Sequence, residues 1–155
     1  MVLNISGCWK NTKDMPFPMR TLCQGTMVAG PILIFALILP IAAWRIGERY
    51  LSYGELWSSG VGETMIIFIG STTVGAWLLA MRKERGRRLV MLGTLVPSVL
   101  VLVVPAFSDY AGHSQKLEFI LQVIAFYGLQ YWALFRWAAF QVYLGQGAVD
   151  HESAA

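Results

Sequence analysis

A single charged side chain, Arg136, lies within the segment YGLQYWALFRWAAF (Tyr127 to Phe140), which is otherwise apolar and aromatic apart from Gln130. A guanidinium stays protonated and offers five N–H donors, so it suits a phosphate, a carboxylate or another anion. The alternative is that the long side chain extends to the nearest aqueous surface and only anchors the segment. Which of the two applies depends on the element that carries Arg136.

Other residue patterns that support chemistry are missing from the sequence. The two histidines, His113 and His151, lie in polar segments, and the spacing of Cys8 and Cys23 matches no zinc site. The stretch GSTTVG, which starts at Gly70, lacks the lysine of a phosphate-binding loop. We therefore expect neither an enzyme nor a protein with a bound metal or cofactor.

The composition is that of a membrane protein, with 56% hydrophobic and 14% charged residues in a chain of 155. The apolar residues gather in runs close to the ~20 residues that cross a hydrocarbon core. These runs lack the alternation of barrel strands and therefore predict helices, which satisfy their own backbone in lipid. The predicted fold class is all-α: an integral membrane bundle of four antiparallel, up-down transmembrane helices at residues 26–46, 63–81, 88–107 and 117–144, with cytoplasmic tails at residues 1–24 and 145–155.

Basic residues are distributed unevenly about these spans. Eight Lys and Arg residues lie in the N-terminal tail and in the loop RKERGRR, and three lie on the opposite side. By the positive-inside rule both termini are cytoplasmic, in a bacterial inner membrane or an equivalent plasma-type membrane. The loop is a candidate contact for anionic lipid headgroups through Arg82, Lys83, Arg85, Arg87 and Arg88, with an acidic partner protein as the alternative. The positive charge thus indicates a membrane surface and not a nucleic acid.

The longest loop, Arg45 to Glu63, is predicted on the outer face. It carries Tyr50, Tyr53 and Trp57, whose amphipathic rings favour the depth of the lipid headgroups. We expect most of the loop to lie on the membrane surface. Its three aromatic residues form a candidate docking patch for a partner.

The depth of Arg136 follows from the predicted fourth helix, in which it lies about 12 Å from the inner end. Thr72 and Thr73 of the second span are predicted at a similar depth, and Gln122 lies close to the line of Arg136 along its helix. If the second and fourth spans are neighbours, these four residues form a polar intramembrane site for an anion, a lipid phosphate or an acidic group. Gln130 points about 120° away, at ~100° per residue, and is predicted to face a different neighbour.

The expected function is non-catalytic. The aromatic fourth span and the small residues Gly70, Ser71 and Gly75 of the second favour helix–helix contacts. In size and layout the chain resembles small four-span inner-membrane proteins of bacteria, which include immunity proteins against pore-forming bacteriocins and accessory subunits. The resemblance implies an accessory, regulatory or immunity-type partner of another membrane protein. The alternative is a small oligomeric transporter or channel subunit, with prolines such as Pro31 and Pro97 as hinges.

Overall fold

The computed structural model describes residues 9–40, 44–46, 49–103 and 113–145, and these are mostly helical. The long helices are α2 (Phe17–Ile38), α4 (Val61–Ala80), α5 (Arg85–Val103) and α7 (His113–Phe135). The shorter elements are η1 (Thr12–Asp14), β1 (Trp44–Ile46), β2 (Arg49–Leu51), α3 (Tyr53–Ser58) and α8 (Ala138–Tyr143). The predicted all-α class is confirmed, with a small antiparallel hairpin added, in which Trp44 pairs with Leu51.

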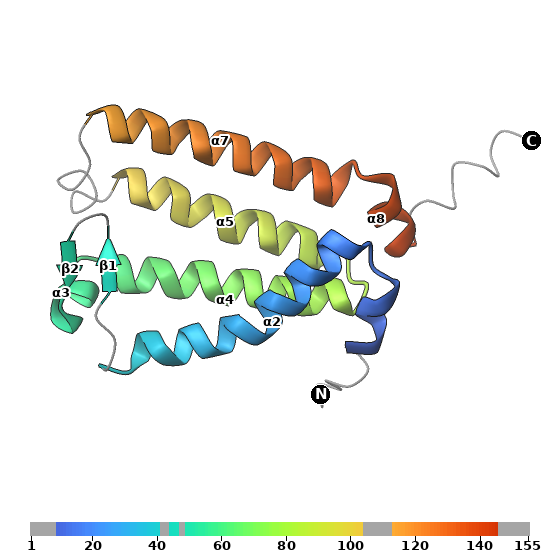
Figure 1. Cartoon of the computed structure of the whole chain (residues 1–155), viewed down its shortest axis with the longest axis horizontal. Helices are drawn as coiled ribbons and strands as arrows, with labels where there is room; N and C mark the ends of the chain where they lie inside the picture. Colours follow the sequence, from blue (N-terminus) through green and yellow to red (C-terminus); the bar gives the residue numbers. More distant parts are fainter. Residues whose placement is uncertain (1–8, 41–43, 47–48, 104–112, 146–155) are drawn as a thin grey trace, which may run out of the picture.

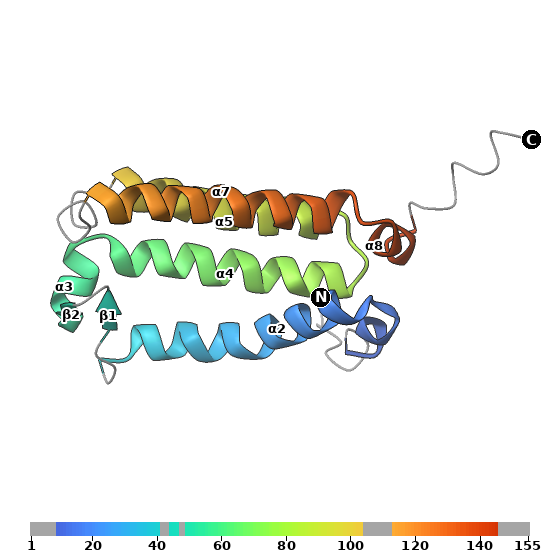
Figure 2. The ribbon, with the colours of Figure 1, turned by 45° about the horizontal axis from the view of Figure 1, so that its top comes forward.

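The four long helices lie side by side in the order α2, α4, α5, α7 and alternate in direction (Figure 1). Contacts join each consecutive pair, whereas α2 and α7 form the two edges of an open, curved row (Figure 2). We call the end where α2 and α5 begin and α4 and α7 end the basic end. The opposite end, which carries β1, β2 and α3, is the hairpin end.

The closest helix pair is α4 and α5. A Cβ added to Gly86 would lie 2.8 Å from both the Gly75 carbonyl oxygen and the Leu79 nitrogen, so a side chain does not fit there. Gly93 faces the Ser71 side chain in the same way. Glycines at these positions bring the two backbones together, as small residues do between membrane helices.

The first helix begins earlier than predicted. The expected start was near residue 26, but α2 begins at Phe17, so residues 17–24 belong to the helix and not to a tail. Pro18 lies in its first turn, where a missing N–H group costs nothing. The tails at residues 1–8 and 146–155 and the predicted end of the third span, residues 104–107, lie outside the described residues.

The fourth helix is interrupted, in contrast to the continuous helix expected over residues 117–144. α7 ends at Phe135, and the N–H groups of Arg136 and Trp137 both donate to the Trp132 carbonyl, at 2.8 and 2.9 Å. The chain then turns into α8, which packs at the end of α4. The Tyr143 hydroxyl lies 3.2 and 3.3 Å from the carbonyl oxygens of Leu79 and Ala80 at that end.

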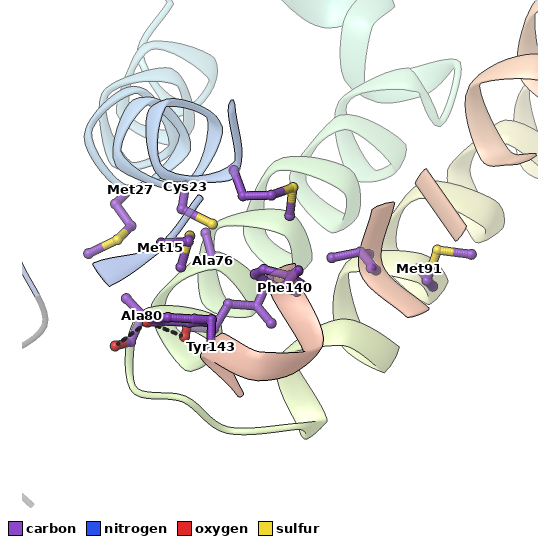
Figure 3. Close-up of a cluster of buried hydrophobic side chains, with 11 residues drawn as sticks. Met15, Cys23, Met27, Ala76, Ala80, Met91, Phe140 and Tyr143 are labelled. Atoms are coloured by element: carbon purple, nitrogen blue, oxygen red, sulfur yellow. Dashed lines mark hydrogen bonds between the residues drawn. The ribbon is translucent and has the colours of Figure 1, made fainter. Parts of the chain in front are cut away.

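A buried cluster at the basic end explains this turn (Figure 3). Sulfur-bearing side chains four residues apart share one face of the N-terminal segment: Met15, Met19, Cys23 and Met27. They belong to the same cluster as Phe140 and Tyr143 of α8 and Leu79 of α4, all buried. Phe140, which follows the turn after α7, is completely buried in this cluster.

Candidate functional site

The open side of the helix row holds a groove of about 790 Å³ between α2 and α7. Its walls are mainly apolar, with Leu22, Gly25 and Ala29 from α2 and Phe126 and Leu129 from α7. α4 and α5 form its floor and contribute threonine side chains: Thr72, Thr73 and Thr94. The groove is therefore mainly hydrophobic and has few polar groups.

The groove begins at the basic end and extends past the middle of α2, to Leu33. Along α4 it extends from Phe68 to Leu79, or ~17 Å at the helical rise. At the basic end it is lined by Trp132 and Trp137, whose rings stack with centroids 6.1 Å apart and planes 13° apart. Arg136 lies between these two residues in the chain and is exposed.

Gln130 links α7 to the neighbouring helix. The Thr94 hydroxyl of α5 lies 2.8 Å from Gln130 Oε1 and donates to it. Gln130 thus faces α5, whereas Arg136 lies beyond the end of α7 and is exposed. This bond fixes the angular position of α7, and with it the residues that α7 turns toward the groove.

Thr72 and Thr73 both line the groove but differ in hydrogen bonding. The Thr72 hydroxyl donates to the Phe68 carbonyl at 2.7 Å, within its own helix. Thr73 is buried against Gly30 of α2, and its Oγ1 has no hydrogen-bond partner among the described residues. The Thr72 hydroxyl thus bonds to the backbone of α4, whereas the Thr73 side chain lies at the contact between α2 and α4.

The four-residue polar site predicted around Arg136 is not assembled. The depth of ~12 Å assumed a continuous helix, whereas Arg136 follows the last residue of α7 and is exposed at the basic end. α7 packs against α5, so no hydrogen bond in the described part of the chain joins Arg136 to Thr72 or Thr73. Gln122 donates instead to Glu118 at 3.3 Å, about four turns from Arg136.

The cations of the α4–α5 turn divide into three kinds. Lys83, Arg85 and Arg88 are exposed, as a headgroup contact requires. Arg82 has a left-handed backbone, with φ at 57°, and its Nη2 lies 2.7 Å from Asp14 Oδ2. Its guanidinium also lies 5.0 Å from the centroid of the Tyr143 ring, so Arg82 joins the N-terminal segment, the turn and α8.

Arg87 corrects the prediction for this loop. Its side chain is only 2% exposed, and its Nη2 donates to Gln141 Oε1 of α8 at 3.0 Å. The guanidinium lies 5.4 Å from the centroid of the Phe135 ring at the end of α7. Arg87 therefore contacts the protein around the turn from α7 to α8 and does not reach an external headgroup.

Arg20 is a residue whose position the sequence did not reveal. It lies on α2 between the groove-lining residues Met19 and Thr21. Its guanidinium lies 5.5 Å from the centroid of the Phe17 ring, one turn closer to the basic end. Once α2 is known to begin at Phe17, the (i, i+3) spacing of Phe17 and Arg20 predicts this contact.

The candidate outer docking patch is only partly available for a partner. The Tyr53 hydroxyl donates to the Ile38 carbonyl at 2.8 Å, and its ring meets Trp57 edge-on, with centroids 6.1 Å apart. The Trp57 ring packs on Gly62 at the start of α4. Tyr53 and Trp57 thus hold α3 between α2 and α4, while Tyr50 is largely exposed.

By length and composition, two of the described helices, α2 and α4, could cross a membrane, and the apolar part of α7 is shorter, Ile120–Phe135. The described residues contain no group of three or more His, Cys, Asp or Glu side chains that could hold a metal ion. Comparisons with protein-family models, curated proteins and solved structures found no match.

Proposed function

We propose that the chain is an integral membrane protein in which all four long helices cross the bilayer. The observation that carries this proposal is the exposure of large apolar side chains along both edge helices. Ile32 and Phe35 of α2 are 62% and 66% exposed, and Ile124 and Leu129 of α7 are each 63% exposed. A soluble monomer rarely leaves such extended apolar surfaces in water, whereas lipid covers them at no cost.

The hydroxyl groups on the helices support the same placement. Thr21, Thr72 and Ser98 each donate to the carbonyl four residues earlier in their own helix. Hydrocarbon offers no water to a free hydroxyl, so this arrangement suits a helix in lipid. An aqueous surface would not require it.

Charge supports an orientation with the basic end in the cytoplasm. The described residues at that end (9–20, 81–88 and 136) include nine Lys or Arg residues and two acidic ones, Asp14 and Glu84. Those at the hairpin end (44–46, 49–63 and 113–118) include three of each sign. An excess of Lys and Arg marks the cytoplasmic side, as in a bacterial inner membrane or an equivalent membrane.

Within this membrane we assign the chain a non-catalytic role, as an accessory, regulatory or immunity-type partner that contacts another membrane protein through α7. α7 is an edge helix, and Leu121, Ile124 and Tyr131 are exposed on its outer side. Gly128 lies among them, and a Cβ added there would meet no heavy atom within 4 Å in the described structure. A flat position flanked by apolar side chains allows the close approach of a partner helix.

Site-specific photocrosslinking tests this role. A photoreactive phenylalanine analogue at Ile124 should crosslink in membranes to one protein of different sequence, and Gly128→Leu should abolish that product. Gly70→Leu, on α4, is the matched control because a Cβ there also meets no heavy atom within 4 Å. Crosslinking of Ile124 only to copies of this chain, together with ion conduction in liposomes, would overturn the proposal in favour of an oligomeric channel or transporter.

A further inference from the structure

We propose that the groove between α2 and α7 binds one anionic phospholipid from the leaflet at the basic end. Its acyl chains lie in the groove, and its phosphate is bound by Arg20 and Arg136. This inference depends on the proposed membrane placement of the four helices. It does not depend on the partner assigned to the outer face of α7.

The length of the groove distinguishes a lipid from a helix. The groove extends ~17 Å along α4, from Phe68 to Leu79, and ~22 Å along α2, from Pro18 to Leu33. It begins at the basic end and does not reach the hairpin end, so it is shorter than a hydrocarbon core of ~30 Å. A transmembrane helix of a partner would need an apolar groove along the whole core, which is longer than this groove on either helix.

The shape of the α2 wall leaves room for acyl chains. Gly25 and Ala29, one turn apart, line the groove and are exposed. A Cβ added to Gly25 would meet no heavy atom within 4 Å in the described structure. A larger side chain at either position would enter the space between α2 and α7.

The charges at the mouth of the groove suit a phosphate. Arg20 lies on α2 between the lining residues Met19 and Thr21, and Arg136 lies between the lining residues Trp132 and Trp137, so the two cations come from opposite sides of the groove. Guanidinium binds phosphate oxygens through paired N–H donors. Trp132 and Trp137 line the groove on either side of Arg136 in the chain, and indole rings favour the depth of the headgroups. The apolar groove therefore ends in a cationic and aromatic mouth.

Native mass spectrometry tests the occupancy of the groove. The chain is reconstituted with equal amounts of phosphatidylglycerol and phosphatidylcholine, extracted in mild detergent and weighed with its retained lipids. One phosphatidylglycerol should remain bound to the wild type. Gly25→Leu and Ala29→Leu should each remove it, whereas Gly70→Leu should retain it, and all three proteins should stay monodisperse.

The arginines are tested by their effect on lipid preference. Arg20→Gln and Arg136→Gln should each reduce the preference for phosphatidylglycerol over phosphatidylcholine by roughly fivefold, the effect of one cation near a lipid surface. Arg85→Gln is the control, because Arg85 is exposed at the start of α5 and neither of its neighbours in the chain lines the groove. The preference should also decline with added salt.

Three results would overturn the lipid assignment. The first is that monodisperse Gly25→Leu and Ala29→Leu retain phosphatidylglycerol. The second is that the wild type retains both lipids equally. The third is that the wild type retains a polypeptide and no lipid, and that Gly25→Leu removes this polypeptide. The proposed membrane placement fails separately, if alkaline carbonate extracts the wild-type chain from membranes.

Discussion

The α4–α5 interface and the gap between α2 and α7 use the same residue type in opposite ways. Gly86 lies against the backbone of α4, where a Cβ would come within 2.8 Å of two backbone atoms. Gly25 lies on the wall of the groove, where a Cβ would meet nothing within 4 Å in the described structure. A glycine against a neighbour's backbone sets the distance between helices, whereas a glycine at an open wall leaves space for a ligand. The helix row thus has a closely packed centre and an accessible edge.

The largest effect on stability is expected at the α4–α5 interface. Gly86→Ala should lower the thermal stability of the purified protein, because overpacking costs about 1–3 kcal/mol and outweighs the ~1 kcal/mol gained in helix propensity. Gly70→Ala, which adds the same methyl group in open space, should be neutral or stabilising. The loss of monodisperse protein on heating measures both. Equal behaviour of the two variants would mean that α4 and α5 do not approach as described.

A smaller effect is expected where α8 joins the centre of the row. Tyr143→Phe removes the hydroxyl near the Leu79 and Ala80 carbonyls and should cost about 0.5–1.5 kcal/mol, the usual range for a hydrogen bond. The control is Tyr131→Phe, because Tyr131 is exposed and keeps its ring stacked on Phe135. The same heating assay applies. If Tyr131→Phe lowers the thermal stability more than Tyr143→Phe does, α8 does not pack at the end of α4.

The smallest difference in stability is expected between variants of two threonines. Thr94→Val removes the bond to Gln130 and should cost about 0.6 kcal/mol, the average for such bonds between membrane helices. Thr73→Val should be neutral or slightly stabilising, because its buried hydroxyl has no hydrogen-bond partner in the described structure. Paired melting curves of the two variants would show the difference. If Thr73→Val lowers the stability more than Thr94→Val does, the polar contact lies between α2 and α4 and not between α5 and α7.

Much of the helix arrangement could be predicted because it depends on local sequence. Long apolar runs located the four helices, and the angular step along a helix predicted that Gln130 faces a neighbouring helix, which is α5. The early start of α2 was also readable, since Pro16 and Pro18 mark a helix start. The predicted start lies near residue 26 because it was set by the apolar run alone.

The site was harder to predict because it depends on contacts between distant segments. The turn at Arg136 follows from the packing of Phe140 and Tyr143 against α4, more than 55 residues earlier in the chain. The burial of Arg87 depends on Gln141 of α8 in the same way. Neither partner is recognisable from the spacing within one helix. All five basic residues of the loop RKERGRR were therefore predicted to contact headgroups, although Arg87 is buried.

The most direct test asks whether four helices or only two cross the membrane. Single cysteines replace exposed residues well inside each long helix (Val28, Ile67, Val96 and Ile124) in a chain whose Cys8 and Cys23 are alanine. None of the four should react with a membrane-impermeant maleimide in intact vesicles of either orientation. Lys83→Cys should react only from the cytoplasmic side and Ser58→Cys only from the other. Reaction at Val96→Cys or Ile124→Cys in intact vesicles would contradict a bilayer crossing by α5 or α7.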